Sequence, residues 1–131
     1  MNAELWKTIR HFNRAEFVCH HCGQEDMRHS FVAMLDDLRE RFMRPLVISS
    51  GYRCEEHNRL VSSTGSKGPH VCGVAADIQC FGSEAHRLLG IAMSMSFAGV
   101  GISQKSGDVG SRYIHLDMLI DRSHRPTIWS Y

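Results

Sequence analysis

The stretch YIHLD, residues 113–117, has the alternating pattern of a β-strand. Successive side chains of a strand point to opposite faces of the sheet, so every second residue shares a face. The residues that share one face here are Tyr113, His115 and Asp117. A second stretch, GPHVCGVAAD at residues 68–77, has a histidine in a loop and an aspartate in the strand that follows, and Gly73 lets the backbone turn between them. The two stretches thus place two imidazoles and one carboxylate where they can converge on one ion.

The three residues that can converge are His70, Asp77 and His115. Two imidazoles and one carboxylate leave a coordination position open for water, as catalytic zinc requires. A zinc ion lowers the pKa of its water towards about 7 and polarises a carbonyl oxygen. A single histidine in a strand is more often an ordinary core or surface residue than a ligand, and the His-x6-Asp spacing is weak on its own. The spacing therefore supports a hypothesis of a metal site and leaves the ordinary interpretation open.

The rest of the chain alternates between helical and strand patterns. Residues 27–43 carry an apolar stripe at helical spacing, with Asp36 and Asp37 facing away from it, and Pro45 ends this helix. We expect further helices at 54–61 and 83–95, and strands at 46–48, 74–80, 99–102 and 112–119. Strands interleaved with two sizeable helices predict an α+β fold, in which helices pack on a small, mostly antiparallel sheet. Residues 1–131 are long enough for one core, so we expect a single domain.

Composition and charge exclude several classes of protein. The 15 basic residues against 14 acidic ones leave a net charge of +1, so we expect no nucleic-acid partner. No apolar run approaches the ~20 residues that span a bilayer, so we expect no membrane insertion. Arg10, His11 and Arg14 interrupt the N-terminus where a signal peptide would be apolar, so we expect synthesis in the cytoplasm without a signal peptide. We also expect a monomer.

Five blocks of the sequence point to a known family. They are Ser49–Arg53, His57-Asn58, Gly68–Ile78, Tyr113–Asp117 and Arg125–Tyr131. In this order they resemble the zinc D-Ala-D-Ala carboxypeptidase family, which shares its fold with the Hedgehog signalling domain. The last block, with Glu16–Cys19 and Cys22-Gly23, is similar to a small phage- or prophage-type branch of that family. Five ordered blocks are far more specific than any one motif.

The resemblance implies a fold of the Hedgehog and DD-peptidase type and a zinc metallopeptidase. It implies that His70, Asp77 and His115 bind the catalytic zinc, and that Arg53 reaches the scissile carbonyl or the substrate carboxylate. A guanidinium suits both tasks, because it offers paired donors to a carboxylate and can stabilise an oxyanion. The implied substrate is the stem peptide of bacterial peptidoglycan, cleaved by carboxypeptidase or endopeptidase action of D,D or L,D type. A phage lysis enzyme would be released to the cell wall after synthesis, and a cytoplasmic peptide-processing role fits equally well.

The chain departs from the family where an acidic residue or histidine usually precedes the last zinc ligand. Arg112 and Tyr113 stand there, and neither is an ordinary general base near neutral pH. Asp117 is a candidate base, or else it orients an imidazole, and Tyr113 is a candidate hydrogen-bond donor to the transition state. Asp108 and His57 are weaker candidates for the base. The missing base keeps open an alternative function, a non-catalytic zinc-stabilised module that binds peptide or cell wall.

The cysteines suggest a second, conditional metal site. Cys19, Cys22, Cys54 and His57 form a C-x2-C plus C-x2-H arrangement, which has the ligand types of a structural zinc site. A Cys19–Cys22 redox pair, a disulfide to Cys54 and plain buried thiols are competing interpretations. Cys72 and Cys80 are expected to be small apolar fillers, and His20 and His21 exposed loop residues. The sequence therefore predicts one zinc ion at the catalytic site and leaves open a second, structural one.

Overall fold

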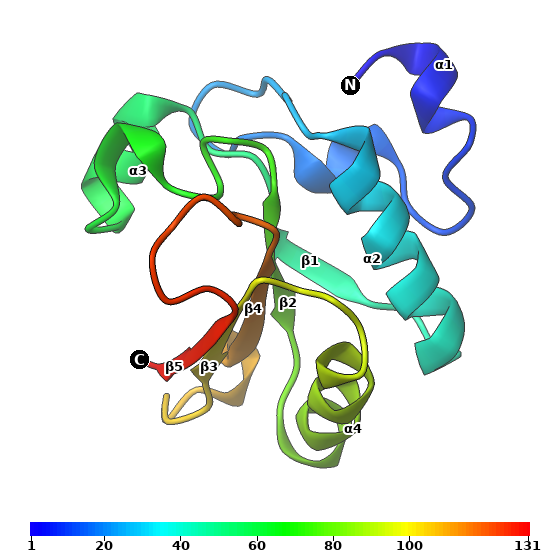
Figure 1. Ribbon diagram of the computed structural model, residues 1–131, viewed down its shortest axis with the longest axis vertical. Helices are drawn as coiled ribbons and strands as arrows, with labels where there is room; N and C mark the ends of the chain where they lie inside the picture. The colour runs from blue at the N-terminus through cyan, green and yellow to red at the C-terminus, as the bar shows by residue number, and fades with distance from the viewer.

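The computed structural model describes residues 1–131 and contains one five-stranded sheet with helices on both sides (Figure 1). The strands are β1 (Val47–Ser50), β2 (Ala75–Gln79), β3 (Gly99–Ser103), β4 (Tyr113–Asp117) and β5 (Thr127–Ser130). The helices are α1 (Ala3–Trp6), α2 (His29–Phe42), α3 (Glu55–Val61) and α4 (Gly82–Met93). Short 3-10 turns lie at Arg14–Phe17, Gly65–Lys67 and Val109–Ser111. None of the helices is long and apolar enough to cross a membrane.

The order of strands across the sheet is β1-β2-β4-β3-β5. β2 pairs with β1 and with β4, and β4 pairs with β3, in each case antiparallel. Only the pairing of β5 with β3 is parallel. This architecture confirms the predicted α+β fold with a mostly antiparallel sheet.

The two faces of the sheet have different chemistry because side chains alternate along each strand. One face carries the apolar residues of β2, β3 and β4, and α2 and α4 cover it. The buried residues that form this core include Phe31, Leu35, Leu38, Ala76, Ile78, Leu88, Val100, Ile114 and Leu116. The opposite face carries the polar residues of β2 and β4, and it lies on the side of α3 and of the segment between β4 and β5 (Figure 1). The hydrophobic core thus packs against one face of the sheet, and the polar residues of the opposite face can form a functional site.

The structure differs from the sequence predictions at two places. Asp36, expected to face away from the core, is 3% exposed, because its carboxylate accepts the backbone N–H groups of Arg10 and His11 at 3.0 and 2.9 Å. The N-terminal segment therefore folds back over α2 and is held there by that carboxylate. The sequence did not predict the strand β5. It is only four residues long, and its parallel partner β3 is distant in the sequence.

Candidate metal centre and active site

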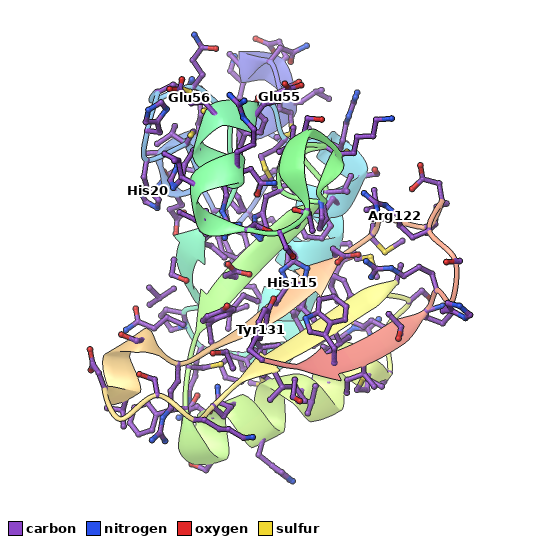
Figure 2. All side chains as sticks on the ribbon, turned by 90° about the vertical axis from the view of Figure 1, so that its left-hand side faces the viewer. His20, Glu55, Glu56, His115, Arg122 and Tyr131 are labelled. Carbon is purple, nitrogen blue, oxygen red and sulfur yellow. The ribbon has the colours of Figure 1, made fainter.

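Asp77 and His115 are direct partners across β2 and β4. Both side chains point away from the helical core, and the carboxylate Oδ1 lies 2.9 Å from the imidazole Nδ1. Figure 2 looks onto this face of the sheet, where His115 lies near the centre. The antiparallel register therefore sets two of the three predicted metal ligands side by side.

The loop before β2 brings in His70. Its Nε2 lies 3.3 Å from Asp77 Oδ1, and its ring centroid is 5.1 Å from that of His115. Gly73 turns the chain from this loop into β2 with φ at +72°, and a Cβ there would lie 2.0 Å from the carbonyl oxygen of Asp26. The predicted turn at Gly73 is thus present, and the neighbouring backbone leaves no room for a side chain in it.

The hydrogen bonds of the two imidazoles determine which nitrogens are free. Nδ1 of His70 lies 2.7 Å from the carbonyl oxygen of Gly51, which can only accept, so Nδ1 carries the proton and Nε2 has the lone pair. Nε2 of His115 lies 2.7 Å from Asp117 Oδ2 and donates to it, so Nδ1 has the lone pair. When both imidazoles are neutral, both lone pairs face Asp77 Oδ1, and three acceptors converge with no proton between them.

This donor set fits a zinc ion. The three ligand atoms all lie within 4.8 Å of one another. Tetrahedral zinc with bonds of about 2.0–2.1 Å to nitrogen and oxygen sets its ligands about 3.3 Å apart, close to the separations of 2.9 and 3.3 Å that Asp77 Oδ1 makes with the two imidazoles. Three converging acceptors repel one another unless a cation lies between them. The residues present therefore suit the metal that the sequence led us to expect.

Burial and the neighbouring groups shift the pKa of all three residues. Burial lowers the pKa of His70 and keeps the imidazole neutral. Burial alone would raise the pKa of Asp77, but the neighbouring imidazoles of His115 and His70 hold it well below its usual range. For His115 burial alone would lower the pKa, but the carboxylates of Asp117 and Asp77 raise it. The carboxylate of Asp77 is thus ionised and available at neutral pH.

Arg53 lies directly against this cluster. Its Nη2 donates to Asp77 Oδ2 at 3.0 Å, its Nε donates to Ser50 Oγ at 3.1 Å, and its Nη1 lies 3.4 Å from Asn58 Oδ1. Each terminal nitrogen keeps a second N–H group beyond these contacts. Arg53 is therefore oriented by its neighbours and still has donors to offer a ligand.

Asp117 is fully buried behind His115. Besides the bond from His115 Nε2, its carboxylate accepts Arg125 Nη1 at 3.0 Å and the backbone N–H of Leu119 at 3.0 Å. Burial alone would raise the pKa of Asp117, but these partners lower it. Gly99 makes the arrangement possible, because a Cβ at this position would lie 1.8 Å from Arg125 Nη1 and 2.4 Å from the carboxylate.

Sequence reasoning assigned no role to Arg125 or Trp129. Arg125 pairs with Asp117 and lies 5.3 Å above the ring of Trp129, whose centroid is 5.3 Å from that of His115. Both residues belong to the C-terminal block of the resemblance, Arg125–Tyr131, which implies no role for either. β5 carries Trp129 to the site through its parallel pairing with β3.

The cluster opens into a cleft of about 330 Å³. Its lining residues are Arg53, Val61, Ser62, Ser63, Thr64, Pro69, His70, Asp77, Tyr113, His115, Arg125, Trp129 and Tyr131. Burial raises the pKa of the Tyr113 phenol, and the nearby Asp77 carboxylate adds to the rise. Asp77 is the only carboxylate in the lining, and neither Asp108 nor His57 belongs to it. The cleft thus offers hydrogen-bond donors but no carboxylate besides Asp77.

The predicted cysteine cluster forms elsewhere, beside α3. The sulfurs of Cys19, Cys22 and Cys54 all lie within 4.8 Å of one another, and all cysteines of the chain are free thiols. His57 Nδ1 lies 3.6 Å from Cys19 Sγ. Burial alone would raise the pKa of Cys19, but hydrogen bonds from the backbone of Cys54, Cys22 and His21 and from the His57 side chain lower it to about 5.

The other cysteines and histidines differ from this cluster. Burial raises the pKa of Cys80 to about 11, as expected for a thiol packed in the protein. Cys72 is half-buried in the loop that carries His70. His20 is exposed, and its Nε2 lies 3.0 Å from the carbonyl oxygen of Ser49. His21 is exposed too, as predicted. Its Nδ1 lies 3.4 Å from Cys54 Sγ, and the sequence did not predict this contact.

Comparison with known proteins bears on this geometry. A family model described as Peptidase M15, a family of zinc-dependent peptidases, matches residues 10–117. No curated protein matches the chain in sequence. The matched region includes the three converging residues, Arg53 and the cysteine cluster, and it covers most of the chain. The resemblance to the zinc D-Ala-D-Ala carboxypeptidase family is thereby confirmed, and the chain belongs to the Peptidase M15 family.

Proposed function

We propose that the chain hydrolyses peptide bonds in the stem peptides of bacterial peptidoglycan, as a carboxypeptidase or endopeptidase of D,D or L,D type. The observation that carries the proposal is the convergence of His70 Nε2, Asp77 Oδ1 and His115 Nδ1 at the base of a cleft that also presents Arg53. Membership of a peptidase family supports hydrolysis of a peptide bond. A phage- or prophage-encoded enzyme released to the cell wall after its synthesis is the setting we propose.

His70, Asp77 and His115 would hold the zinc ion. When bound, zinc lowers the pKa of a water molecule towards about 7 and polarises the carbonyl of the scissile bond. Arg53 holds Asp77 in place through Nη2, and its remaining N–H groups donate to the carbonyl oxygen as negative charge develops or to a substrate carboxylate. Tyr113 keeps its proton near neutral pH, because its pKa is raised, and acts as a further donor from the wall of the cleft.

Asp117 serves in this proposal to orient His115 and not as the general base. Its carboxylate is fully buried, and it is occupied by His115 Nε2, Arg125 and the backbone of Leu119. A base must come within hydrogen-bond reach of the proton that it takes, and Asp117 faces the side of the imidazole away from Asp77. A carboxylate behind a ligating imidazole fixes its tautomer and increases its basicity.

The cleft suits a short peptide segment. Its volume of about 330 Å³ is at the lower end of the range for small-molecule sites. The aromatic rings of Tyr113, Trp129 and Tyr131 form an apolar wall of the cleft, and Arg53 adds positive charge to its lining. Small apolar side chains and a free carboxylate, which D-alanine has, match this combination.

A second candidate function is a non-catalytic module that binds peptide or cell wall. It is favoured by one observation, the absence from the cleft of any carboxylate or imidazole other than the three proposed ligands. Such a module would bind stem peptides through Arg53 and the aromatic wall and release no product.

Hydrolysis of purified muropeptides by the zinc-loaded protein tests the proposal. Mass spectrometry of the products identifies the bond that is cleaved, and His115→Ala is the matched control because it removes one ligand. We expect turnover by the wild-type protein and none by His115→Ala. Equal turnover by both proteins, or no turnover by either, would overturn the proposal that the chain is a zinc-dependent hydrolase. Saturable binding of muropeptides without turnover would favour the binding module.

A further inference from the structure

A tight turn near the N-terminus presents two thiols on one side. The turn is Cys19-His20-His21-Cys22-Gly23, and it closes through a hydrogen bond of 2.8 Å from Gly23 N to Cys19 O. Gly23 has φ at +73°, a conformation that glycine adopts without steric cost. Backbone N–H groups of Cys54, Cys22 and His21 lower the pKa of the Cys19 thiol. Backbone donors directed at a sulfur stabilise its thiolate, which is the form that binds a metal.

The start of α3 brings a third thiol to this turn. Cys54 is the N-cap of α3, its Sγ accepts the backbone N–H of His57 at 3.4 Å, and its own N–H donates to Cys19 Sγ at 3.4 Å. Figure 2 shows the labelled His20 of the turn at the same end of the molecule as Glu55 and Glu56, the first residues of α3. The three sulfurs come within 4.8 Å of one another, although Cys54 is more than thirty residues from Cys22 in the chain.

Two imidazoles border the three sulfurs. His57 Nδ1 is 3.6 Å from Cys19 Sγ, and His21 Nδ1 is 3.4 Å from Cys54 Sγ, with the ring centroids 5.9 Å apart. His57 is half-buried on α3, one helical turn after Cys54, whereas His21 is exposed. Position on an ordered helix and contact with the buried sulfur both favour His57 as a ligand.

We propose that Cys19, Cys22, Cys54 and His57 bind a second zinc ion in a closed, structural site. Structural zinc is almost always tetrahedral and takes three cysteines and a histidine as one of its common ligand sets. Zinc–sulfur bonds of about 2.3 Å place sulfurs roughly 3.8 Å apart, within the spacing of this cluster. Soft thiolate ligands select zinc over magnesium or calcium. None of the four residues lines the cleft, so this site is separate from the proposed catalytic one.

The second site supports the first through the segment between them. Residues 51–53 immediately precede Cys54 and carry the carbonyl of Gly51 that holds His70, as well as Arg53 itself. The backbone N–H of Tyr52 donates to the carbonyl of Phe17 at 2.9 Å, two residues before Cys19. A metal that joins Cys19 and Cys22 to Cys54 would therefore hold together the two segments that this hydrogen bond connects. We expect its loss to loosen Arg53 and His70.

Counting the metal ions per chain tests the proposal without any measurement of activity. Native mass spectrometry of the zinc-loaded wild-type protein should show two zinc ions per chain. Cys19→Ser with Cys22→Ser should leave one, His70→Ala with His115→Ala should leave the other one, and the control Cys80→Ser should keep two. The proposal of a second site would be overturned if the wild-type protein held only one zinc ion and the cysteine variant retained it.

A second measurement uses only the wild-type chain, in case the cysteine variant does not fold. Cobalt in place of zinc should give sulfur-to-cobalt charge-transfer absorption, which the ligands His70, Asp77 and His115 cannot produce. Zinc should protect the exposed Cys22 from alkylation until a chelator is added. Absence of the absorption band, unprotected Cys22, or a protein mass lowered by the two hydrogens of a disulfide would each contradict the proposal.

Single substitutions identify the fourth ligand. In the cobalt protein His57→Ala should change the absorption spectrum and weaken metal binding, and His21→Ala should leave both unchanged. The reverse result would overturn the assignment of His57. Because these readouts concern the thiolate-bound metal alone, failure of muropeptide hydrolysis has no bearing on them.

Discussion

Asp77 and His115 oppose each other across β2 and β4, and Asp117 lies behind His115, so a single antiparallel register aligns a carboxylate, an imidazole and a second carboxylate. A shift of the register by one residue would turn His115 into the helical core and replace it by Ile114 or Leu116. The buried residues of α2 and α4 prevent such a shift, because they need Ile114 and Leu116 on their own side. The hydrophobic core thus determines the geometry of the polar cluster.

The bond from His115 to Asp117 predicts the effect of Asp117→Asn. Without the negative charge, Asp117 holds the tautomer and orientation of His115 less firmly. Groups that hydrogen-bond a ligating imidazole typically contribute 10–100-fold to metal affinity or activity. We expect a decrease of about that size in zinc affinity, measured by competition with a chelator on protein whose fold is checked by circular dichroism. Asp121→Asn, at an exposed position after β4, is the control and should be unchanged. Unchanged zinc affinity in Asp117→Asn would contradict the orienting role.

Tyr113→Phe tests the donor on the wall of the cleft. Its raised pKa keeps the phenol protonated near neutral pH, so only the O–H group is lost in this substitution. Removal of one transition-state donor typically lowers kcat by about 10²–10³-fold. We expect that decrease with unchanged zinc content, and little change in Tyr52→Phe, whose ring packs against the hydrophobic core. A kcat of Tyr113→Phe equal to that of the wild type would exclude the role.

Gly99→Ala tests the close approach between β3 and the pair formed by Asp117 and Arg125. The new methyl group would lie 1.8 Å from Arg125 Nη1, so the ion pair must move. Overpacking of this kind typically costs about 1–3 kcal/mol, measured as the free energy of unfolding in urea. The control Gly90→Ala lies within α4 with open space around it, and helix propensity predicts that it is stabilising by about 0.5–1 kcal/mol. A stability equal to that of the wild type in Gly99→Ala would argue against the packing described.

Asp36 predicts a pH-dependent contribution to stability. Burial alone would raise its pKa, but hydrogen bonds from Arg10 and from the backbone of His11 lower it in the folded state. A lowered folded-state pKa means that the contribution is present above the unfolded-state value of about 3.9 and is lost as the pH falls towards the folded-state value.

We expect Asp36→Asn to lower the free energy of unfolding by about 1–3 kcal/mol at neutral pH, because two backbone donors lose a charged acceptor. The difference from the wild type should shrink at about pH 3, near the pKa of an unfolded aspartate. The neighbouring Asp37, 63% exposed, makes only a surface ion pair with Arg10, so Asp37→Asn should cost less than about 1 kcal/mol. Urea unfolding at both pH values checks this, and a difference independent of pH would contradict it.

Several features of the fold were open to prediction from local pattern. The alternation in residues 113–117 indicates a strand with His115 and Asp117 on one face, and the apolar stripe of α2 indicates a helix that covers a core. Both patterns are local, since side-chain periodicity depends only on the backbone conformation of the element itself. The burial of Asp36 and the position of β5 were not predictable in this way, because each depends on a segment that is distant in the chain.

The candidate sites divide along the same line. The sequence by itself determined the residue types, namely two histidines and an aspartate in strand and loop positions, a C-x2-C turn and an arginine after β1. Only the tertiary structure decided that Asp117 lies behind His115 with Arg125 against it, that His57 joins the thiols and not the cleft, and that no further carboxylate lines the cleft. The physical reason is that ligand identity belongs to a residue, whereas proximity requires strand register and loop closure, which are set by the packing of the whole core.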